Sequence, residues 1–483
     1  MSTTFFPLNG ATNVCEDVEL KLTFSSTPSL GTGAIKIYNS SNTLVDTINT
    51  TDENLVIGTV SGSYNKVAVK NQLVYVSGNS VIIKPHTTSA GNASVLANGS
   101  TYYVQVGSGA ISVGGSSYTI SDTSWKFTIR STPSISSTIT VGKNGTEDFY
   151  TLQGAFNYLM ANKKSGDYTI KVSGGKYYEF LHFNNASTPN VTIIGDSSST
   201  PQFHWQNGQS FSSTTFSNSV AGVRTRSTFV WQGGNLTLKN LKFFNDLNIS
   251  AGGNLQAETL EFDKAGKKLA AYNCKFSSYQ DTIYIGTNVK AWFYKCEIVG
   301  DVDTIWGYAD TALFEKCTFS IAASSKDPST NSYQFETRIG YGNTTGLYGK
   351  GFVALNCTIK TGDSTEAYYL ARRASSSTDY YDQVAFINPK FSTGVTSSGF
   401  LTTKAFRGIV SGSNVLVGAN VYNVSGVTTD TSKYIGVLSS SVYKAEYSTR
   451  DKILNKCVNS KTNSYQACSS TWDLSTLETL FGL

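Results

Sequence analysis

Two aspartates stand at equivalent positions of a sequence repeat. Asp281 and Asp303 each follow a cysteine by seven residues, and these cysteines, Cys274 and Cys296, are 22 residues apart. If each repeat forms one coil of stacked strands, the two carboxyl groups lie side by side, about 4.8 Å apart. Like charges that close repel, so one carboxyl is expected to keep its proton while the other is ionised. Such a pair can carry out acid–base or nucleophilic catalysis.

Further polar side chains are expected near this pair. Gln256 lies 25 residues before the first aspartate, close to one coil upstream, and with Gln280 it could donate amide hydrogens to one substrate oxygen. Arg372, or the competing Arg373, could hold an aspartate or a substrate carboxylate with two hydrogen bonds. Trp306 could stack on a sugar ring or be a core aromatic. A plain polar ladder or a calcium site is the competing interpretation, but such sites seldom gather Asp, Gln, Arg and Trp together.

The repeat that carries the aspartates is an apolar strand, then Asn or Lys, usually Cys, and an apolar residue two positions later. Its central residues are 241, 274, 296, 317, 357 and 389, so the intervals are 33, 22, 21, 40 and 32. A base period near 21 or 22 with insertions is typical of a parallel β-helix. We therefore predict an all-β chain in which residues 134–483 form a right-handed parallel β-helix. The cysteines would stack as small buried groups and not form a metal cluster, since no Cys-x-x-Cys occurs.

Residues 1–133 are predicted to be a separate β-sandwich. Short alternating strands recur between Gly, Asn and Ser clusters, and residues 131–137 look like a linker. The segment resembles the bacterial SbsA-type Ig-like domains. A spacer or folding partner is preferred over a carbohydrate-binding module. After the linker, one helix is predicted from apolar residues at helical spacing, which are Phe149, Leu152, Ala155, Phe156, Leu159 and Met160.

The composition excludes several classes of protein. Charged residues make up only 15% of the 483, and no Lys/Arg run occurs, so neither a coiled coil nor a nucleic-acid partner is expected. The three histidines are not at metal-ligand spacing, so no metal site is predicted. No apolar run is long enough for a membrane span. The best disulfide candidates are Cys457 and Cys468 in the turn-rich tail.

The N-terminus and the sequons bear on localisation. Residues 1–9 lack the charged and apolar regions of a signal peptide. Asn-x-Ser/Thr sequons, for example at Asn39, Asn144 and Asn235, favour secretion with the signal already removed, so an extracellular location is predicted. We also expect a monomer.

Several stretches over residues 139–405 resemble the pectin methylesterases of carbohydrate esterase family 8. The similarity includes the spacing of Gln-Asp-Thr and Val-Asp-x-Ile-x-Gly, which is highly specific. The matching stretches are 141–155, 175–179, 256–257, 279–282, 300–307 and 370–372.

This resemblance implies roles for the residues already singled out. Asp303 would attack the methyl ester of a galacturonate unit of pectin, and Asp281 would protonate the leaving methanol and then activate water. Gln256 and Gln280 would stabilise the oxyanion, and Arg372 would keep the nucleophile ionised. No cofactor is required. Substrate contacts are expected from Trp306, Tyr279, Arg373 and Thr304.

The chain departs from the family pattern around the site. Arg373 and Ala374 replace the usual Pro-Trp, so one sugar-stacking aromatic is missing there. Thr304 and Trp306 stand in place of two phenylalanines, and Gly399-Phe400 replaces a Gly-Trp. These changes are expected to leave the chemistry intact, but they leave substrate length, methylation pattern and processivity open.

Two other functions compete with the esterase. A polygalacturonase-like hydrolase needs carboxyls about 6.5–9.5 Å apart if it inverts, which is wider than the stacking distance expected here. A non-catalytic pectin-binding surface protein would bind without turnover. Release of methanol without new reducing ends from methylated pectin separates the esterase from both.

Overall fold

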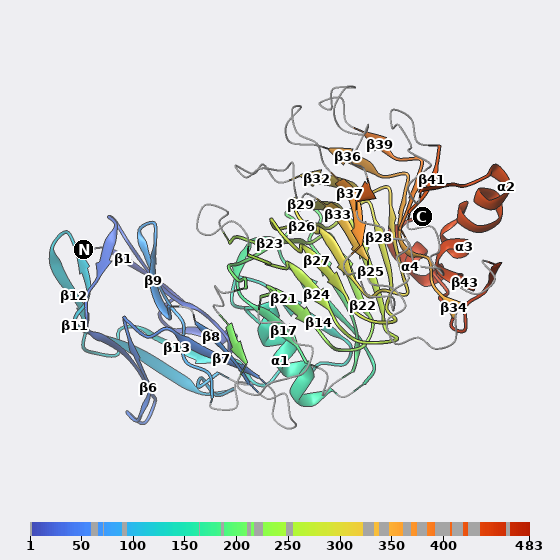
Figure 1. The fold of residues 1–483 in the computed structure, drawn as a ribbon. Coiled ribbons are helices and arrows are strands. Elements are labelled where there is room, and N and C mark those ends of the chain that lie inside the picture. Colours follow the sequence, from blue (N-terminus) through green and yellow to red (C-terminus); the bar gives the residue numbers. More distant parts are fainter. Residues whose placement is uncertain are drawn as a thin grey trace. The chain divides into compact units, whose positions relative to one another are not determined.

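The computed structural model divides the chain into two compact units (Figure 1). One unit is Met1–Pro201 with Ser212–Ala221, and the other is Gln202–Phe211 with Gly222–Leu483. This division does not coincide with the predicted boundary after residue 133, and the assignment of an Ig-like domain stays a prediction. The structure describes residues 2–58, 66–70, 72–88, 94–163, 165–184, 188–209, 214–216, 226–247, 255–321, 333–337, 347–360, 369–373, 384–391, 406–407, 419–423, 435–459 and 464–483.

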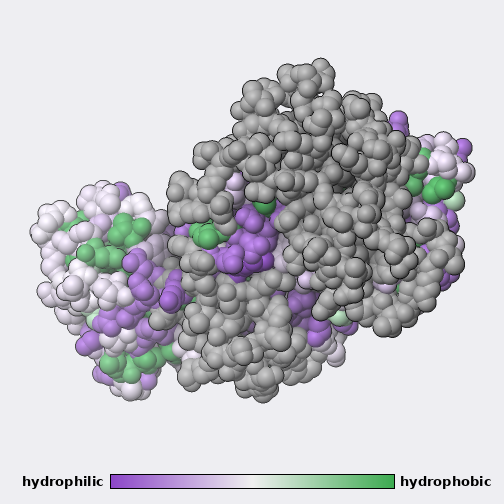
Figure 2. Space-filling view, viewed as in Figure 1, coloured by the Kyte–Doolittle hydropathy of each residue, from purple (hydrophilic) through white to green (hydrophobic). Residues whose placement is uncertain are grey.

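Most strands of the first 130 residues form two mainly antiparallel sheets around one hydrophobic core. Alternation builds this core: in β3, Leu20, Leu22 and Phe24 are buried and the residues between them are half-buried. Hydrophobic and hydrophilic residues mix on the visible surface of these elements (Figure 2). One sheet has the order β1 (Thr3–Phe6), β3 (Leu20–Phe24), β10 (Ser80–Ile83), β9 (Val74–Ser77). The other has the order β2 (Ala11–Val14), β13 (Lys126–Ile129), β11 (Thr101–Val113), β5 (Ala34–Asn39), β6 (Leu44–Asn49), with β4 (Pro28–Leu30) and β12 (Ser116–Ile120) also paired to β11.

The rest of the first unit contains the start of the parallel strands and the predicted helix. Helix α1 (Leu152–Asn162) buries the apolar residues that the periodicity indicated, and the Thr151 side chain caps it by accepting from the Gly154 N–H. Phe149 is buried just before the helix. The strands are β14 (Thr138–Val141), β15 (Asp167–Val172), β16 (Lys176–Tyr178), β17 (Leu181–Phe183) and β18 (Asn190–Gly195), and the separate sheet β20 (Thr214–Phe216), β8 (Lys66–Lys70), β7 (Asn54–Gly58).

The second unit is a parallel β-helix whose strands stack in chain order in three sheets (Figure 1). The first sheet contains β22 (Leu236–Lys239), β25 (Lys268–Tyr272), β28 (Lys290–Tyr294), β31 (Thr311–Glu315), β35 (Gly351–Leu355), β38 (Val384–Ile387), β41 (Ala419–Tyr422) and β42 (Ile435–Val437). The second contains β19 (Gln202–Trp205), β23 (Lys242–Asn245), β26 (Lys275–Ser277), β29 (Glu297–Gly300), β32 (Thr318–Ile321), β36 (Thr358–Lys360) and β39 (Lys390–Phe391). The third contains β21 (Phe229–Trp231), β24 (Leu260–Phe262), β27 (Ile283–Ile285), β30 (Ile305–Gly307), β33 (Tyr333–Thr337), β37 (Tyr369–Arg373) and β40 (Phe406–Arg407).

The strand register reproduces the sequence repeat. In the first sheet the residues paired from coil to coil are separated by the intervals of the motif. The Asn or Lys before each central position turns the chain with a positive φ, which asparagine tolerates better than most residues. These turn residues are Asn240, Asn273, Lys295, Lys316, Asn356 and Asn388.

The four repeat cysteines are buried, as predicted, and none of the four is in a disulfide. Thiols on later coils donate toward carbonyls of the preceding coil, for example Cys357 Sγ to Phe314 O at 3.1 Å. Burial raises the pKa of Cys274, and the neighbouring Cys296 adds to this increase. Burial also acts to raise the pKa of Cys296, but hydrogen bonds from Cys274 and Cys317 outweigh it and lower that pKa. Because all four thiols are buried, we assign the ladder to packing. Cys457 and Cys468 form the predicted disulfide between β43 (Lys456–Asn459) and β44 (Ser464–Ala467).

The C-terminal segment covers the outer face of the first sheet. Ile453, Leu454 and Phe481 join one hydrophobic cluster with Trp292 and Leu313 of the sheet. Both faces of β28 and β31 are thereby buried, which explains their nearly continuous apolar sequences. The segment contains α2 (Ser440–Val442), the π-helical turn η2 (Tyr443–Tyr447), α3 (Arg450–Asn455), α4 (Ser475–Phe481) and the hairpin β43–β44, to which β34 (Leu347–Tyr348) is paired.

Candidate functional site

The two aspartates occupy the same position on consecutive coils. Strands β27 and β30 pair with Ile283 opposite Ile305, and each aspartate stands two residues before its isoleucine. Both have a positive φ, 60° for Asp281 and 49° for Asp303. The Asp281 N–H donates to Val302 O at 2.9 Å, and Gln280 forms a parallel bridge with Val302. The backbone therefore holds the two carboxyl-bearing turns in register.

Both carboxyl groups of this pair are buried, which makes their ionisation costly. Asp281 and Asp303 are each only 2% exposed. A buried carboxylate is costly unless cations or hydrogen bonds compensate it, so the surrounding donors decide its charge.

A third acid belongs to the same column. Leu260 of β24 pairs with Ile283, which places Glu258 one coil before Asp281 at the equivalent position. Glu258 is fully buried. The register therefore stacks three carboxyl groups on successive coils, although the sequence analysis singled out only two. The spacing of 258, 281 and 303 is a signal that could have found the third.

Arg226 places a positive charge beside these stacked acids. The motifs in the sequence did not indicate this residue. Its Nε donates to Glu258 Oε1 at 2.7 Å, and a terminal nitrogen donates to Asp281 Oδ2 at 3.1 Å. The other terminal nitrogen donates to Gln256 Oε1. The guanidinium carbon also lies 5.3 Å from the centroid of the Trp306 ring. One guanidinium thus joins two acids, an amide and an aromatic ring.

No local pattern in the sequence predicts that Arg226 belongs to the site. It stands three residues before β21, and the register of β21 with β24 places it level with Ala257, between Gln256 and Glu258. Only the pairing of these strands makes the contact visible.

The aromatic and hydroxyl side chains predicted to contact substrate are buried. Trp306 is 3% exposed, with its ring 4.6 Å from that of Tyr284. Tyr279 is 8% exposed and Thr304 is fully buried. Thr304 packs close to Gly300, where an added Cβ would meet its hydroxyl at 2.7 Å. Burial therefore gives no support to substrate contacts by these three residues, and the contacts stay predictions.

For the remaining predicted residues, Gln280, Arg372 and Arg373, the structure gives backbone hydrogen bonds and strand pairing. Gln280 is half-buried, and its carbonyl accepts from the Ala257 N–H at 3.1 Å. Arg372 and Arg373 lie in β37, paired with Glu336 and Thr337 of β33. The side chains of both arginines lie outside the described residues. Within the described part of the chain, the guanidinium bonded to the aspartate pair is that of Arg226, and it reaches Asp281.

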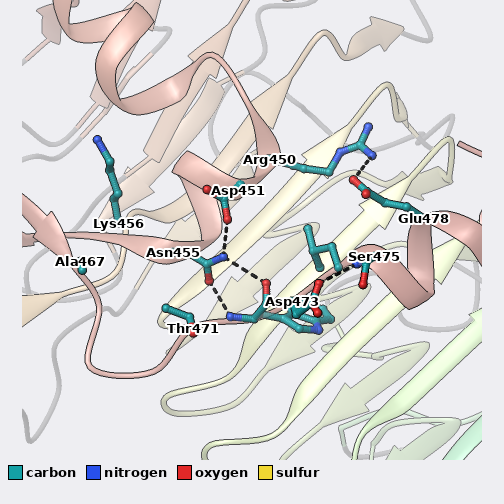
Figure 3. A pocket seen from close by; sticks show the side chains of 11 residues that line it. Arg450, Asp451, Asn455, Lys456, Ala467, Thr471, Asp473, Ser475 and Glu478 are labelled. Carbon is teal, nitrogen blue, oxygen red and sulfur yellow. Dashed lines mark hydrogen bonds and ion pairs between the residues drawn. The ribbon is translucent and has the colours of Figure 1, made fainter.

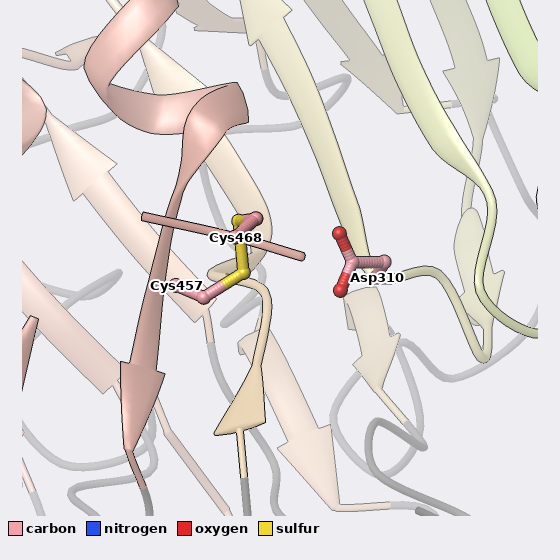
Figure 4. A group of neighbouring side chains, drawn as sticks. All are labelled: Asp310, Cys457 and Cys468. Carbon is pink, nitrogen blue, oxygen red and sulfur yellow. A yellow bond between two sulfur atoms is a disulfide. The ribbon is translucent and has the colours of Figure 1, made fainter. Parts of the chain in front are cut away.

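Two other clusters in the C-terminal segment are structural. The hollow in Figure 3 is lined by polar groups bonded to one another, such as Arg450 with Glu478 at 2.8 Å and Asn455 Nδ2 with Asp451 at 2.7 Å. In Figure 4 the Asp310 carboxylate faces the Cys457–Cys468 disulfide. Disulfide sulfurs are not thiolate ligands, and Asp310 is paired with Lys290 at 2.8 Å, so this group is no metal centre.

Comparison with known proteins gives a consistent family. The model of the Pectinesterase family matches residues 138–435. A pectinesterase/pectinesterase inhibitor of Arabidopsis thaliana is 31% identical over 46% of this chain and 32% of its own length. Pectinesterase A of Aspergillus niger is 29% identical over 52% of this chain and 71% of its own. The chain thus spans about a third of the length of the first of these relatives.

A solved structure supports the fold. A pectin methylesterase in complex with a hexasaccharide aligns with a TM-score of 0.50 and 21% identity, covering 66% of this chain and 98% of that one. In the described part of the chain, no helix is both long and apolar enough to cross a membrane.

Proposed function

Because the chain belongs to the pectinesterase family, we propose that it hydrolyses the methyl esters of homogalacturonan to pectate and methanol. The observation that carries this proposal is the pair of buried carboxyl groups, Asp281 and Asp303, at equivalent turns of consecutive coils. Two such groups can divide the work between a nucleophile and an acid.

In the first half of the reaction, the Asp303 carboxylate attacks the ester carbonyl carbon and forms a tetrahedral intermediate. Gln256 and Gln280 donate amide hydrogens to its oxyanion. The carbon–methoxy bond then breaks while Asp281 transfers its proton to the methoxy oxygen. Methanol leaves, and the galacturonyl group remains on Asp303 as an anhydride.

In the second half, ionised Asp281 takes a proton from a water molecule, whose oxygen attacks the galacturonyl carbon of the anhydride. The bond to Asp303 breaks, which restores its carboxylate and leaves the substrate as a free acid. Asp281 is again protonated, so the cycle closes without any redox partner or cofactor.

Binding of the polymer is assigned to residues around this centre. Arg372 is proposed to keep Asp303 ionised and Arg373 to meet substrate carboxylates, as guanidinium groups do with paired hydrogen bonds. Trp306, Tyr279 and Thr304 complete the proposed substrate contacts. We further propose a secreted monomer in which residues 1–133 form an Ig-like domain and 134–483 the catalytic β-helix.

The direct test is to incubate the protein with highly methylated pectin and to measure methanol and reducing ends separately. The esterase predicts methanol without new reducing ends. New reducing ends would indicate a glycoside hydrolase, and binding without either product would indicate a non-catalytic protein. Either result would refute the proposal.

A single substitution tests the nucleophile. Asp303→Ala should lower methanol release by at least about 10³-fold, because it removes the carboxylate that is proposed to form the anhydride. Asp451→Ala, which removes a carboxylate from the distant helix α3, is the matched control and should keep full activity. Appreciable turnover by Asp303→Ala with an unchanged melting temperature would show that the nucleophile is another residue.

A further inference from the structure

The three stacked acids, called the acid column below, need a compensating positive charge, and Arg226 supplies one. Glu258, Asp281 and Asp303 occupy one position on three consecutive coils, and all are at least 98% buried. Stacked carboxylates at strand spacing cannot all stay ionised without compensation. Among the described side chains, Arg226 is a cation bonded to two of these acids, Glu258 and Asp281.

We propose that Arg226 and Glu258 form a positioning pair that sets the orientation and the protonation of Asp281. The inference rests on the proposed esterase function, in which this aspartate is the acid and then the base. Glu258 holds the guanidinium through Nε at 2.7 Å, and a terminal nitrogen then reaches Asp281 at 3.1 Å. The Trp306 ring, 5.3 Å from the guanidinium carbon, supports the same group from another side.

The contact favours one oxygen of Asp281 as the carrier of the proton. Arginine donates hydrogen bonds and accepts none. A carbonyl oxygen accepts a hydrogen bond better than the hydroxyl oxygen of the same acid, so the bond from Arg226 to Oδ2 favours the proton on Oδ1. Without Arg226 the carboxyl group could protonate on either oxygen, and a part of the enzyme would present the proton in the wrong direction.

The same guanidinium fixes the amide of Gln256. Its Oε1 accepts from Arg226, so the NH₂ group points to the opposite side of the amide. In the proposed reaction this NH₂ is the donor to the oxyanion. One arginine thus orients both the acid and one oxyanion donor.

Glu258 moderates the charge of the guanidinium. In the part of the chain that the structure describes, the charged groups nearest to Asp281 in the coil register are Arg226 and Glu258 from the two preceding coils, and Asp303 and Asp301 from the following one. An uncompensated arginine would favour ionised Asp281, which could not protonate methanol. Because Glu258 neutralises much of that charge, Asp281 can keep its proton while it still accepts the orienting hydrogen bond.

The proposal predicts opposite changes for two variants. In the pH profile of kcat/KM, the alkaline limb reports loss of the proton from the acid, Asp281. Arg226→Gln removes a cation, so this limb should move up by about one pH unit, and kcat should fall about tenfold or more because orientation is lost. Glu258→Gln removes an anion, so the same limb should move down by about one unit. KM should change less than about threefold in both variants, because neither side chain is placed against the polymer.

Three further variants keep the test decisive. The double variant Arg226→Gln/Glu258→Gln removes both charges, so its alkaline limb should return toward that of the wild type while kcat stays low. Arg226→Lys keeps the charge but cannot reach three acceptors, so it should restore the limb and only part of kcat. Lys275 lies on the coil of Asp281 and is paired with Glu297 of the next coil, and Lys275→Gln, which breaks this ion pair, should change neither quantity.

The outcomes separate the inference from the function on which it rests. If the wild type releases no methanol from methylated pectin, the proposed function fails. If the wild type is active but Arg226→Gln and Glu258→Gln leave the alkaline limb unmoved, or move it in the same direction, the positioning pair is refuted. Equal loss of kcat in all variants together with lower melting temperatures and no limb shift would likewise assign the pair to folding alone.

Discussion

Replacing Asp17 by alanine should destabilise the first unit, because this carboxylate holds the start of helix α1. Asp17 lies between β2 and β3 of the N-terminal sheets. Its Oδ1 accepts from the Tyr150 N–H at 2.8 Å. Its Oδ2 accepts from the N–H and the hydroxyl of Thr151 at 2.8 and 2.6 Å. A negative charge at the N-terminus of a helix is also favoured by the helix dipole.

The magnitude follows from these three bonds. A hydrogen bond to a charged group contributes about 1.5–3 kcal/mol, but bonds to one carboxylate are not additive. Loss of a helix cap costs about 0.5–2 kcal/mol. Asp17 is partly buried, so water replaces only some of what is lost. We expect about 3 kcal/mol in the free energy of unfolding, or a melting temperature lower by about 6–12 °C for a unit of this size.

Differential scanning calorimetry on the full chain measures this change. Asp122→Ala is the matched control, because Asp122 is exposed and accepts only a local bond from the Ser124 N–H at 2.9 Å. Limited proteolysis should cut Asp17→Ala near helix α1 sooner than the control. Equal melting temperatures for the two variants would refute the argument that Asp17 anchors the helix.

The same contacts bear on the role of the N-terminal segment. Cys15 Sγ donates to Glu147 O at 3.0 Å, and Arg130 pairs with Asp148 at 3.5 Å, so bonds from both ends of the segment reach the residues before helix α1. The sequence favoured either a spacer or a folding partner as the role of residues 1–133. These bonds support the role of a folding partner more than that of a spacer. Deletion of residues 1–133 is therefore expected to lower stability.

Two further predictions concern buried groups. Burial, with smaller contributions from neighbouring lysines, lowers the pKa of Lys350 to about 7, so between about pH 7 and 10.5 the unfolded chain binds more protons than the folded one. The stability of the wild type relative to Lys350→Met should therefore rise with pH in this window, by about 1.4 kcal/mol per unit at most, and urea unfolding at pH 7.5 and 9.5 measures it. A flat difference would contradict the pKa. The five free thiols are buried, so a thiol reagent should label them only after unfolding exposes them. Rapid labelling of the folded protein would show that the ladder opens.

Much of the fold could be predicted because a parallel β-helix translates sequence spacing directly into spatial position. The motif intervals are the register of the first sheet, and the seven-residue offset from Cys274 and Cys296 places Asp281 and Asp303 on equivalent turns. Helix α1 and the Cys457–Cys468 disulfide followed from local patterns in the same way. The spacing alone could also have found Glu258, had the comparison been extended one coil upstream.

The sequence by itself therefore determined the coil, its period and the pair of aspartates, since these depend on residues a fixed number of positions apart. Only the tertiary structure decided which groups surround that pair. Arg226 reaches Gln256, Glu258 and Asp281 across coils separated by insertions of different lengths, and Asp17 reaches helix α1 across more than 130 residues. Such contacts depend on how far a side chain extends across the folded surface, and no periodicity in the chain encodes that reach.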